Sequence, residues 1–168
     1  MSRLQNSKIL LKKTCILNIL KTFLSRYFMD IDNLVYALEN ETNEQIIDKS
    51  FSSIKSQMND VLQQLGLSRE LLRETLKKLK NYKYCESLKE VEYGRYIRWI
   101  NLKSDELKLT AGGIICKIEL LKCEHLFITV KNNLNRLFKI NFNECLIFQK
   151  LTDQEIIILK VFKYLEKD

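Results

Sequence analysis

The residues with the most evident capacity for chemistry are the single histidine and the cysteines of the C-terminal half. Cys123 and His125 fall on one face of an extended strand, where Cys116 or Cys145 could join them at a metal ion. The spacing differs from that of a zinc finger or ribbon, in which paired Cys or His arms surround a tetrahedral ion. We therefore predict no metal site, and we interpret the cysteines as small hydrophobic residues.

Carboxylates and glycines are the remaining candidates for catalysis. Gly112-Gly113 lacks the further glycines and the lysine of a phosphate-binding loop, and any nucleophilic triad would have to use His125. Two neighbouring carboxylate pairs are better explained as loop residues and as the first turn of a helix: Asp105 with Glu106, and Asp153 with Glu155. We predict no catalytic residue, no cofactor and no enzymatic activity.

The net charge is unevenly distributed along the chain. The 168 residues carry a formal charge of +7, which favours acidic partners such as nucleic acid or an anionic membrane surface. Residues 1–29 carry six Lys or Arg and no acid, residues 30–60 carry seven acids and two lysines, and residues 61–91 are basic again. Five cysteines without disulfide spacing, the lack of a secretory signal and the lack of a membrane-spanning apolar run predict an intracellular protein.

The N-terminal third is predicted to be helical. Residues 8–28 form a basic amphipathic helix, which either contacts a membrane surface or a partner's groove, or packs on its own domain. A short helix capped by Asp30 or Asp32 is expected next. Residues 42–65 then show an apolar pattern typical of a coiled coil or helical hairpin. This seam offers a contact for homo-oligomers through Ile47, Phe51, Ile54, Met58 and Val61.

A helix-turn-helix is predicted over residues 61–79, where Gly66 ends one helix and Ser68 begins the next. The stretch resembles the helix-turn-helix of winged-helix DNA-binding domains, in which apolar residues pack the recognition helix on the core, here Leu72, Leu76 and Leu79. Leu62 departs from that pattern, which favours a small residue where the helices cross. The resemblance implies phosphate or base-edge contacts by Arg69, Arg73, Lys77 and Lys78. The alternative is a plain helical hairpin with a solvated basic face.

The C-terminal half is predicted to form a small β-barrel. Alternating apolar and polar residues indicate five strands, over residues 95–101, 113–121, 125–131, 135–142 and 145–151. Because they are consecutive, an SH3-like barrel is favoured over an OB-like one, with Gly112-Gly113 as a bulge or a sharp bend at a barrel corner and Trp99 in the core. A capping box at Thr152 to Glu155 opens a final helix, which is expected to seal the barrel.

The predicted fold class is therefore α+β with two domains. A helical region occupies residues 1–90, and the barrel with its C-terminal helix occupies residues 91–168. Residues 81–92 are interpreted as a polar connection near the boundary between them.

A basic face that includes aromatic residues is predicted on the barrel. Tyr96 and Arg98 share a strand face opposite Ile97 and Trp99. Such a face can contact a sugar-phosphate backbone while its rings stack on bases. A solvated exterior around an ordinary core gives the same pattern. The other cations of this face are Lys117, Lys131, Arg136 and Lys139.

Three stretches resemble uncharacterised proteins encoded by large nucleocytoplasmic DNA viruses of the mimivirus-like kind. They are Gly94 to Ile100, Leu109 to Ile115 and Phe148 to Glu155, and the resemblance covers residues 78–166. It implies a viral origin and a location in the host cytoplasm, the viral factory or the virion. It implies no active site.

Two functions are predicted for such a chain. The first is a non-enzymatic binding module whose barrel and basic helices engage nucleic acid or another virion component. The second is a structural assembly protein whose N-terminal helices join subunits, bind a partner or contact a membrane. The first predicts binding that weakens steeply with salt, and the second predicts a mass that depends on concentration.

Overall fold

The computed structural model describes residues 31–120 and 126–165, so the predicted amphipathic helix over 8–28 lies outside them. The fold is α+β, as predicted. The chain divides into two compact units, one made of the described residues up to Phe51 and from Thr152 on, the other running from Ser52 to Leu151. The boundary predicted at residues 90 and 91 falls inside the second unit, because helices on both sides of residue 68 pack on the sheet that follows.

The helical unit is assembled from both ends of the described chain. It contains α2 (Ile31–Glu39), the 3-10 turn η2 (Glu41–Asn43), α3 (Glu44–Ile47) and α6 (Asp153–Leu165), and α6 packs on α2 and α3. The C-terminal helix, which we predicted as a seal for the barrel, therefore belongs to this unit. The buried apolar side chains of the unit are Leu34, Ala37, Leu38, Ile46, Ile47, Ile158, Leu159 and Val161.

Two hydrogen-bonding groups order the helical unit. The predicted capping box is confirmed, since the Glu155 N–H donates to Thr152 Oγ1 at 3.1 Å and the Thr152 N–H donates to Glu155 Oε2 at 2.8 Å. Gln154 Oε1 accepts from the side-chain amides of Asn40 at 3.0 Å and of Asn43 at 2.9 Å. These contacts join the first turn of α6 to the segment after α2.

The apolar pattern of residues 42–65, predicted as a coiled coil or a helical hairpin, does not correspond to one continuous helix. The helix is interrupted after α3 ends at Ile47, and α4 (Phe51–Gln63) begins beyond the gap. Ile46 and Ile47 belong to the helical unit, whereas Met58 and Leu62 pack on the sheet. Apolar periodicity indicates that residues are buried, but it does not indicate in which core they are buried. The apolar pattern is therefore continuous in the sequence, although the helix is interrupted.

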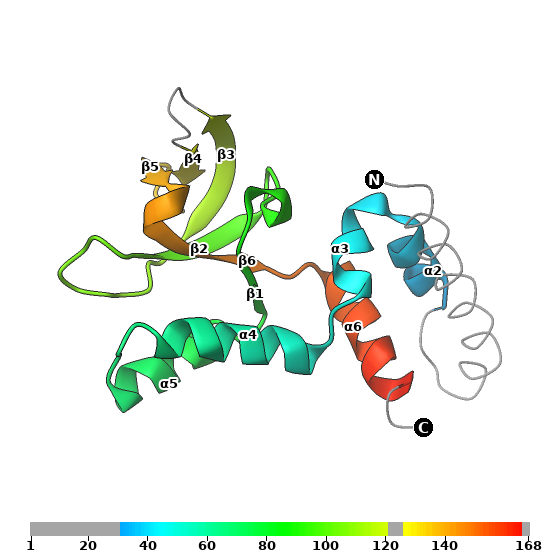
Figure 1. Ribbon diagram of the computed structural model, residues 1–168. Coiled ribbons are helices and arrows are strands. Elements are labelled where there is room, and N and C mark those ends of the chain that lie inside the picture. The colour runs from blue at the N-terminus through cyan, green and yellow to red at the C-terminus, as the bar shows by residue number, and fades with distance from the viewer. Residues whose placement is uncertain (1–30, 121–125, 166–168) are drawn as a thin grey trace. The chain divides into compact units, whose positions relative to one another are not determined.

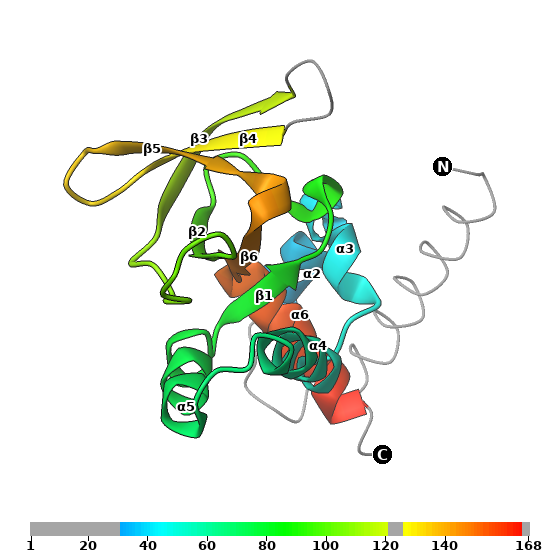
Figure 2. The same ribbon diagram turned by 60° about the vertical axis from the view of Figure 1, so that its left-hand side comes forward.

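The second unit contains six antiparallel strands, in the order β1-β6-β2-β3-β4-β5 (Figures 1 and 2). The five predicted strands are confirmed as β2 to β6, and β1 lies in the segment interpreted as a polar connection. The strands are β1 (Tyr82–Cys85), β2 (Tyr96–Asn101), β3 (Gly113–Leu120), β4 (Leu126–Lys131), β5 (Leu137–Asn141) and β6 (Cys145–Lys150).

The order of the strands differs from a simple meander. Strands β2 to β5 pair consecutively, but β6 returns across the sheet and pairs with β1 and β2. In the described sheet β1 and β5 are therefore edge strands, and the sheet is open. The position of β6 is fixed by apolar partners on its neighbours, such as Trp99 opposite Ile147.

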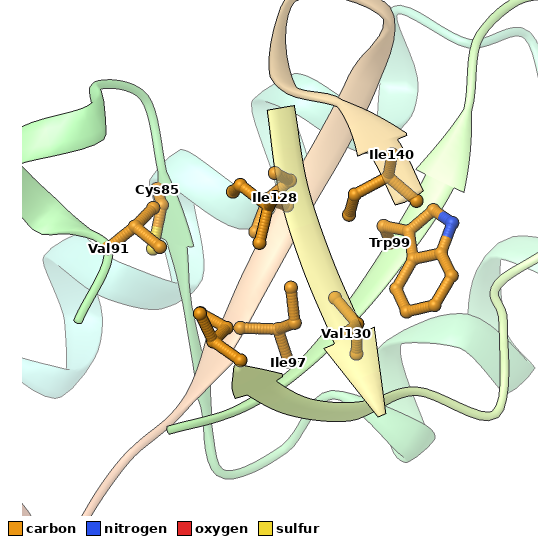
Figure 3. Packing of buried hydrophobic residues seen from close by; sticks show 9 residues of the cluster. Cys85, Val91, Ile97, Trp99, Ile128, Val130 and Ile140 are labelled. Carbon is orange, nitrogen blue, oxygen red and sulfur yellow. The ribbon is translucent and has the colours of Figure 1, made fainter. Parts of the chain in front are cut away.

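Each face of the sheet carries a core. On the inner face, Ile128 and Val130 of β4 project toward Ile97, and Trp99 lies beside Ile140 (Figure 3). Trp99 is thus a core residue, as predicted. On the outer face, α4 and α5 (Arg69–Lys78) cover strands β1, β6 and β2. The buried residues of this second core are Met58, Leu62, Leu79, Tyr82, Ile100 and Phe148, with Leu72 and Leu76 packed against them.

The two adjacent glycines precede a close approach between strands. Gly112 has φ +92°, a left-handed conformation that strongly favours glycine, and Gly113 begins β3. A Cβ at Gly113 would lie 2.4 Å from the carbonyl oxygen of Lys131. The register shift of β3 lies between Ile115 and Lys117, so the bulge, one of the two roles predicted for these glycines, occurs further along the strand.

Candidate nucleic-acid interface

Helix α5 presents a stripe of cations beside its packing face. The turn before it is as predicted, with Gly66 at φ +62° and the Ser68 Oγ accepting the Leu71 N–H at 3.3 Å. Arg69, Arg73 and Lys77 follow at intervals of four residues and are exposed. Within the described chain these three side chains form no ion pair, whereas Lys78 lies 3.7 Å from Glu74.

Leu62 occupies the position at which a helix-turn-helix favours a small residue. Its side chain is fully buried in the core that joins α4 and α5 to the sheet. A bulky residue at this point means that α4 and α5 are held together by side-chain packing and not by close backbone approach. The helix pair therefore has the predicted start and stop signals, but its packing departs from the resemblance.

The cations of the sheet form a second set on the exposed part of the outer face. Lys117 and Lys139 flank Glu119 on this face, with Nζ to carboxylate distances of 2.7 and 3.6 Å. The hydrogen bond from Lys117 lowers the pKa of Glu119. Lys131 lies on the same face and Arg136 lies in the β4–β5 turn, and both are exposed without an ion pair in the described residues.

Arg98 has an internal partner and is not an open phosphate contact. Its guanidinium lies 5.6 Å from the centroid of the Tyr82 ring, and the side chain is half-buried. Tyr96 shares its face, as predicted, but the Tyr96 hydroxyl donates to the Ala111 carbonyl at 2.9 Å. The Phe127 ring is likewise approached by Lys139, at 4.8 Å. These rings are therefore engaged by the protein itself and are poorly placed to stack on bases.

The whole net charge of the chain is carried by the sheet unit. The sequence from Ser52 to Leu151 contains 18 Lys or Arg and 11 Asp or Glu, a net of +7. The remaining sequence contains 10 of each and is neutral overall. Because net charge governs association with polyanions, this unit is the candidate for such binding.

The sheet unit contains a cluster of polar side chains that the sequence did not predict. Lys83 of β1 is only 2% exposed, and its Nζ lies 4.0 Å from Glu92 Oε1. Arg95 Nε lies 3.3 Å from the other Glu92 oxygen, and the Glu92 N–H donates to the buried Gln149 at 3.0 Å. This arrangement connects β1, β6 and the segment before β2. The alternation Tyr82-Lys83-Tyr84-Cys85 carries no signal for it, because a lysine opposite apolar residues normally indicates solvent.

The candidate catalytic and metal-binding residues that the structure describes do not form a cluster. Cys123 and His125 lie outside the described residues, and elsewhere in the described chain no three His, Cys, Asp or Glu side chains gather as a metal site would require. Burial, followed by the nearby Glu144, raises the pKa of Cys145 to about 11. The candidate carboxylates have structural partners. Glu106 forms an ion pair with Lys108 in an exposed loop, and Glu155 caps the first turn of α6.

The apolar residues predicted to form an oligomer contact are largely buried inside the protein itself. Ile47, Ile54 and Met58 are 4 to 6% exposed, and the side chains of Phe51 and Val61 are half-buried. These residues are divided between the two units, because the helix is interrupted between them. The seam therefore does not form a continuous exposed surface.

Comparison with protein-family models, with curated proteins and with solved structures found no match. None of the helices in the described part of the chain has the length and apolarity needed to cross a membrane.

Proposed function

We propose that the protein binds nucleic acid through its sheet unit, and that α5 makes the principal contact. The observation that carries this proposal is the exposed stripe of Arg69, Arg73 and Lys77, whose charges no acidic side chain of the described chain neutralises. Packing of Leu72 and Leu76 holds α5 on the sheet, so the stripe is fixed in position before binding. The concentration of net charge in this unit supports the same conclusion.

Recognition is directed mainly at phosphates. Guanidinium groups form paired hydrogen bonds with phosphate oxygens, and successive turns of a helix place three cations along a backbone. Stacking contributes little, because Tyr82 and Phe127 are engaged by cations of the protein. Lys131 and Arg136 supply additional charge on the sheet, while Arg98 supports Tyr82 and contributes indirectly.

We also propose that the strands of the sheet unit curve into a small barrel. An SH3-like or OB-like barrel is supported by the inner core, to which all six strands contribute, as expected for a strongly curved sheet. The resemblance of residues 78–166 to proteins of large nucleocytoplasmic DNA viruses supports a viral setting for this binding.

The test is a fluorescence-anisotropy titration of the full chain with a labelled 24-base-pair duplex DNA at several salt concentrations. For R69A/R73A we expect weaker binding and a salt slope smaller by about 2, since each phosphate contact contributes about 0.9. The matched control is K103A/K108A, which removes the same charge from the exposed β2–β3 loop. Absence of binding by the wild-type chain at low salt, or equal loss in both double variants, would refute the proposal.

A further inference from the structure

We propose that β5 is a strand-pairing site for an extended segment of another protein in which acidic and apolar residues alternate. The proposal concerns a different part of the sheet unit from α5 and does not depend on nucleic-acid binding. It rests on the backbone groups of β5 that pair with no other described strand, on the two chemically distinct faces of β5 and on the charge of its hairpin.

Strand β5 has backbone N–H and C=O groups that point away from the sheet. It is an edge strand of the described sheet, and in Figure 2 the turn of the β4–β5 hairpin extends to the left. The Asn132 N–H donates to the Arg136 carbonyl at 3.0 Å, which sets the alternation of bonded and non-bonded pairs along the hairpin. Leu137, Lys139 and Asn141 therefore direct their backbone N–H and C=O groups away from β4. An added strand would pair with these groups.

The inner side of β5 requires an apolar neighbour. Phe138 is 42% exposed although its ring lies 6.5 Å from that of Trp99, a member of the inner core. The next inward residue, Ile140, is buried. An apolar side chain on an added strand would cover the exposed part of Phe138 and extend the inner core by one strand.

The outer side of β5 carries Lys139 between Leu137, which is exposed, and Asn141, and the lysine favours an acidic neighbour. The hairpin from Leu126 to Asn141 contains Lys131, Arg136 and Lys139 and no acidic residue. Glu119 on β3 is the acidic group beside Lys139, and it is shared with Lys117. An acidic side chain next to Lys139 would give a favourable cross-strand pair. The two sides of the strand together specify alternation of acidic and apolar residues.

The same charge argues against a second copy as the occupant. In the antiparallel pairing of two β5 strands that uses all their outward-facing groups, Lys139 would lie directly opposite its counterpart. Like charges in that position destabilise pairing, and an edge lysine is a common protection against self-association. Lys139 therefore selects an acidic segment and disfavours β5 of another molecule.

The experiment uses the full chain and a fluorescein-labelled, capped octapeptide of alternating Glu and Val, with binding followed by anisotropy. Three control peptides differ from it in one property each. One has four Glu followed by four Val, one has Lys in place of Glu, and one is methylated on alternate backbone nitrogens. We expect binding of the alternating acidic peptide alone, because the others lack the two-sided pattern, the charge or the hydrogen bonds.

Variants of the protein locate the site. K139E should weaken binding of the acidic peptide roughly tenfold and favour the Lys-Val peptide, because one cross-strand attraction becomes a repulsion. K108E is the matched control in the β2–β3 loop and should leave binding unchanged. Equal binding of the block or methylated peptide, equal effects of K139E and K108E, or no binding of any peptide would overturn the proposal. A concentration-dependent dimer by light scattering that K139E alters would assign β5 to a second copy and overturn the proposed occupant.

Discussion

Replacing Gly113 with alanine tests whether β3 and β4 need an unobstructed approach at the start of β3. The added Cβ would lie 2.4 Å from the Lys131 carbonyl oxygen and 2.7 Å from Val130 Cγ1, whereas ordinary contacts begin at 3.4 Å. The two strands would therefore have to separate by about 1 Å, as in an overpacked core, which costs about 1–3 kcal/mol. Weakening one ladder hydrogen bond adds about 1 kcal/mol, so we expect a loss of about 2–4 kcal/mol.

Gly66→Ala is the matched control for this substitution. Gly66 has φ +62°, but a Cβ at this position would have no atom within 4 Å, so only the backbone conformation opposes the change. A left-handed alanine costs about 1–2 kcal/mol relative to a right-handed one. Comparing the two variants separates a steric cost between strands from a conformational cost in the α4–α5 turn.

The assay is urea unfolding followed by Trp99 fluorescence. Trp99 is the single tryptophan and is 8% exposed in the inner core, so its emission reports on the sheet unit. With a slope of about 2 kcal/mol per M, the expected loss of about 2–4 kcal/mol lowers the G113A midpoint by about 1–2 M, and the G66A midpoint falls by a smaller amount. A G113A midpoint equal to that of the wild type, with an unchanged slope, would refute the close approach of β3 and β4.

Two further predictions concern other parts of the molecule. The Cys145 pKa, raised by burial from 9.0 to about 11, predicts that alkylation of this thiol, measured by mass spectrometry, rises about tenfold per pH unit from 7 to 10 without a plateau. Since the folded-state pKa is the higher one, the associated stability is present below pH 9 and is lost as the pH rises toward 11. N43A removes buried hydrogen bonds to the Ala37 carbonyl and to Gln154, which predicts a loss of about 2 kcal/mol. Amide exchange should then accelerate in residues 31–51 and 152–165, and uniform acceleration across β2 to β6 would contradict this reasoning.

Local patterns in the sequence were sufficient to predict most elements. Alternation of apolar residues predicted strands β2 to β6, and Gly66 with Ser68 marked the turn between α4 and α5. The capping box at Thr152 predicted the start of α6. Each of these signals depends on residues within a few positions of one another, because turns, caps and the pleat of a strand are local in origin.

Some features of the candidate nucleic-acid interface could likewise be predicted from the sequence, whereas others depend on the tertiary structure. The exposure of Arg69, Arg73 and Lys77 follows from the period of α5, so the sequence predicted it. The engagement of Arg98 by Tyr82 and the sharing of Glu119 by two lysines follow from strand pairing, which no local pattern encodes. These contacts change which cations are available to a ligand.

The sequence by itself determined the α+β class, the positions of five strands and the basic stripe of α5, because these depend on composition and local period. Only the tertiary structure decided that β1 joins the sheet, that β6 returns between β1 and β2, and that the two ends of the described chain form one helical unit. It also decided that Lys83 is buried beside Glu92 and that β5 is an edge. The physical reason is that pairing and burial join residues far apart in the chain, where side-chain complementarity and not local spacing selects the partner.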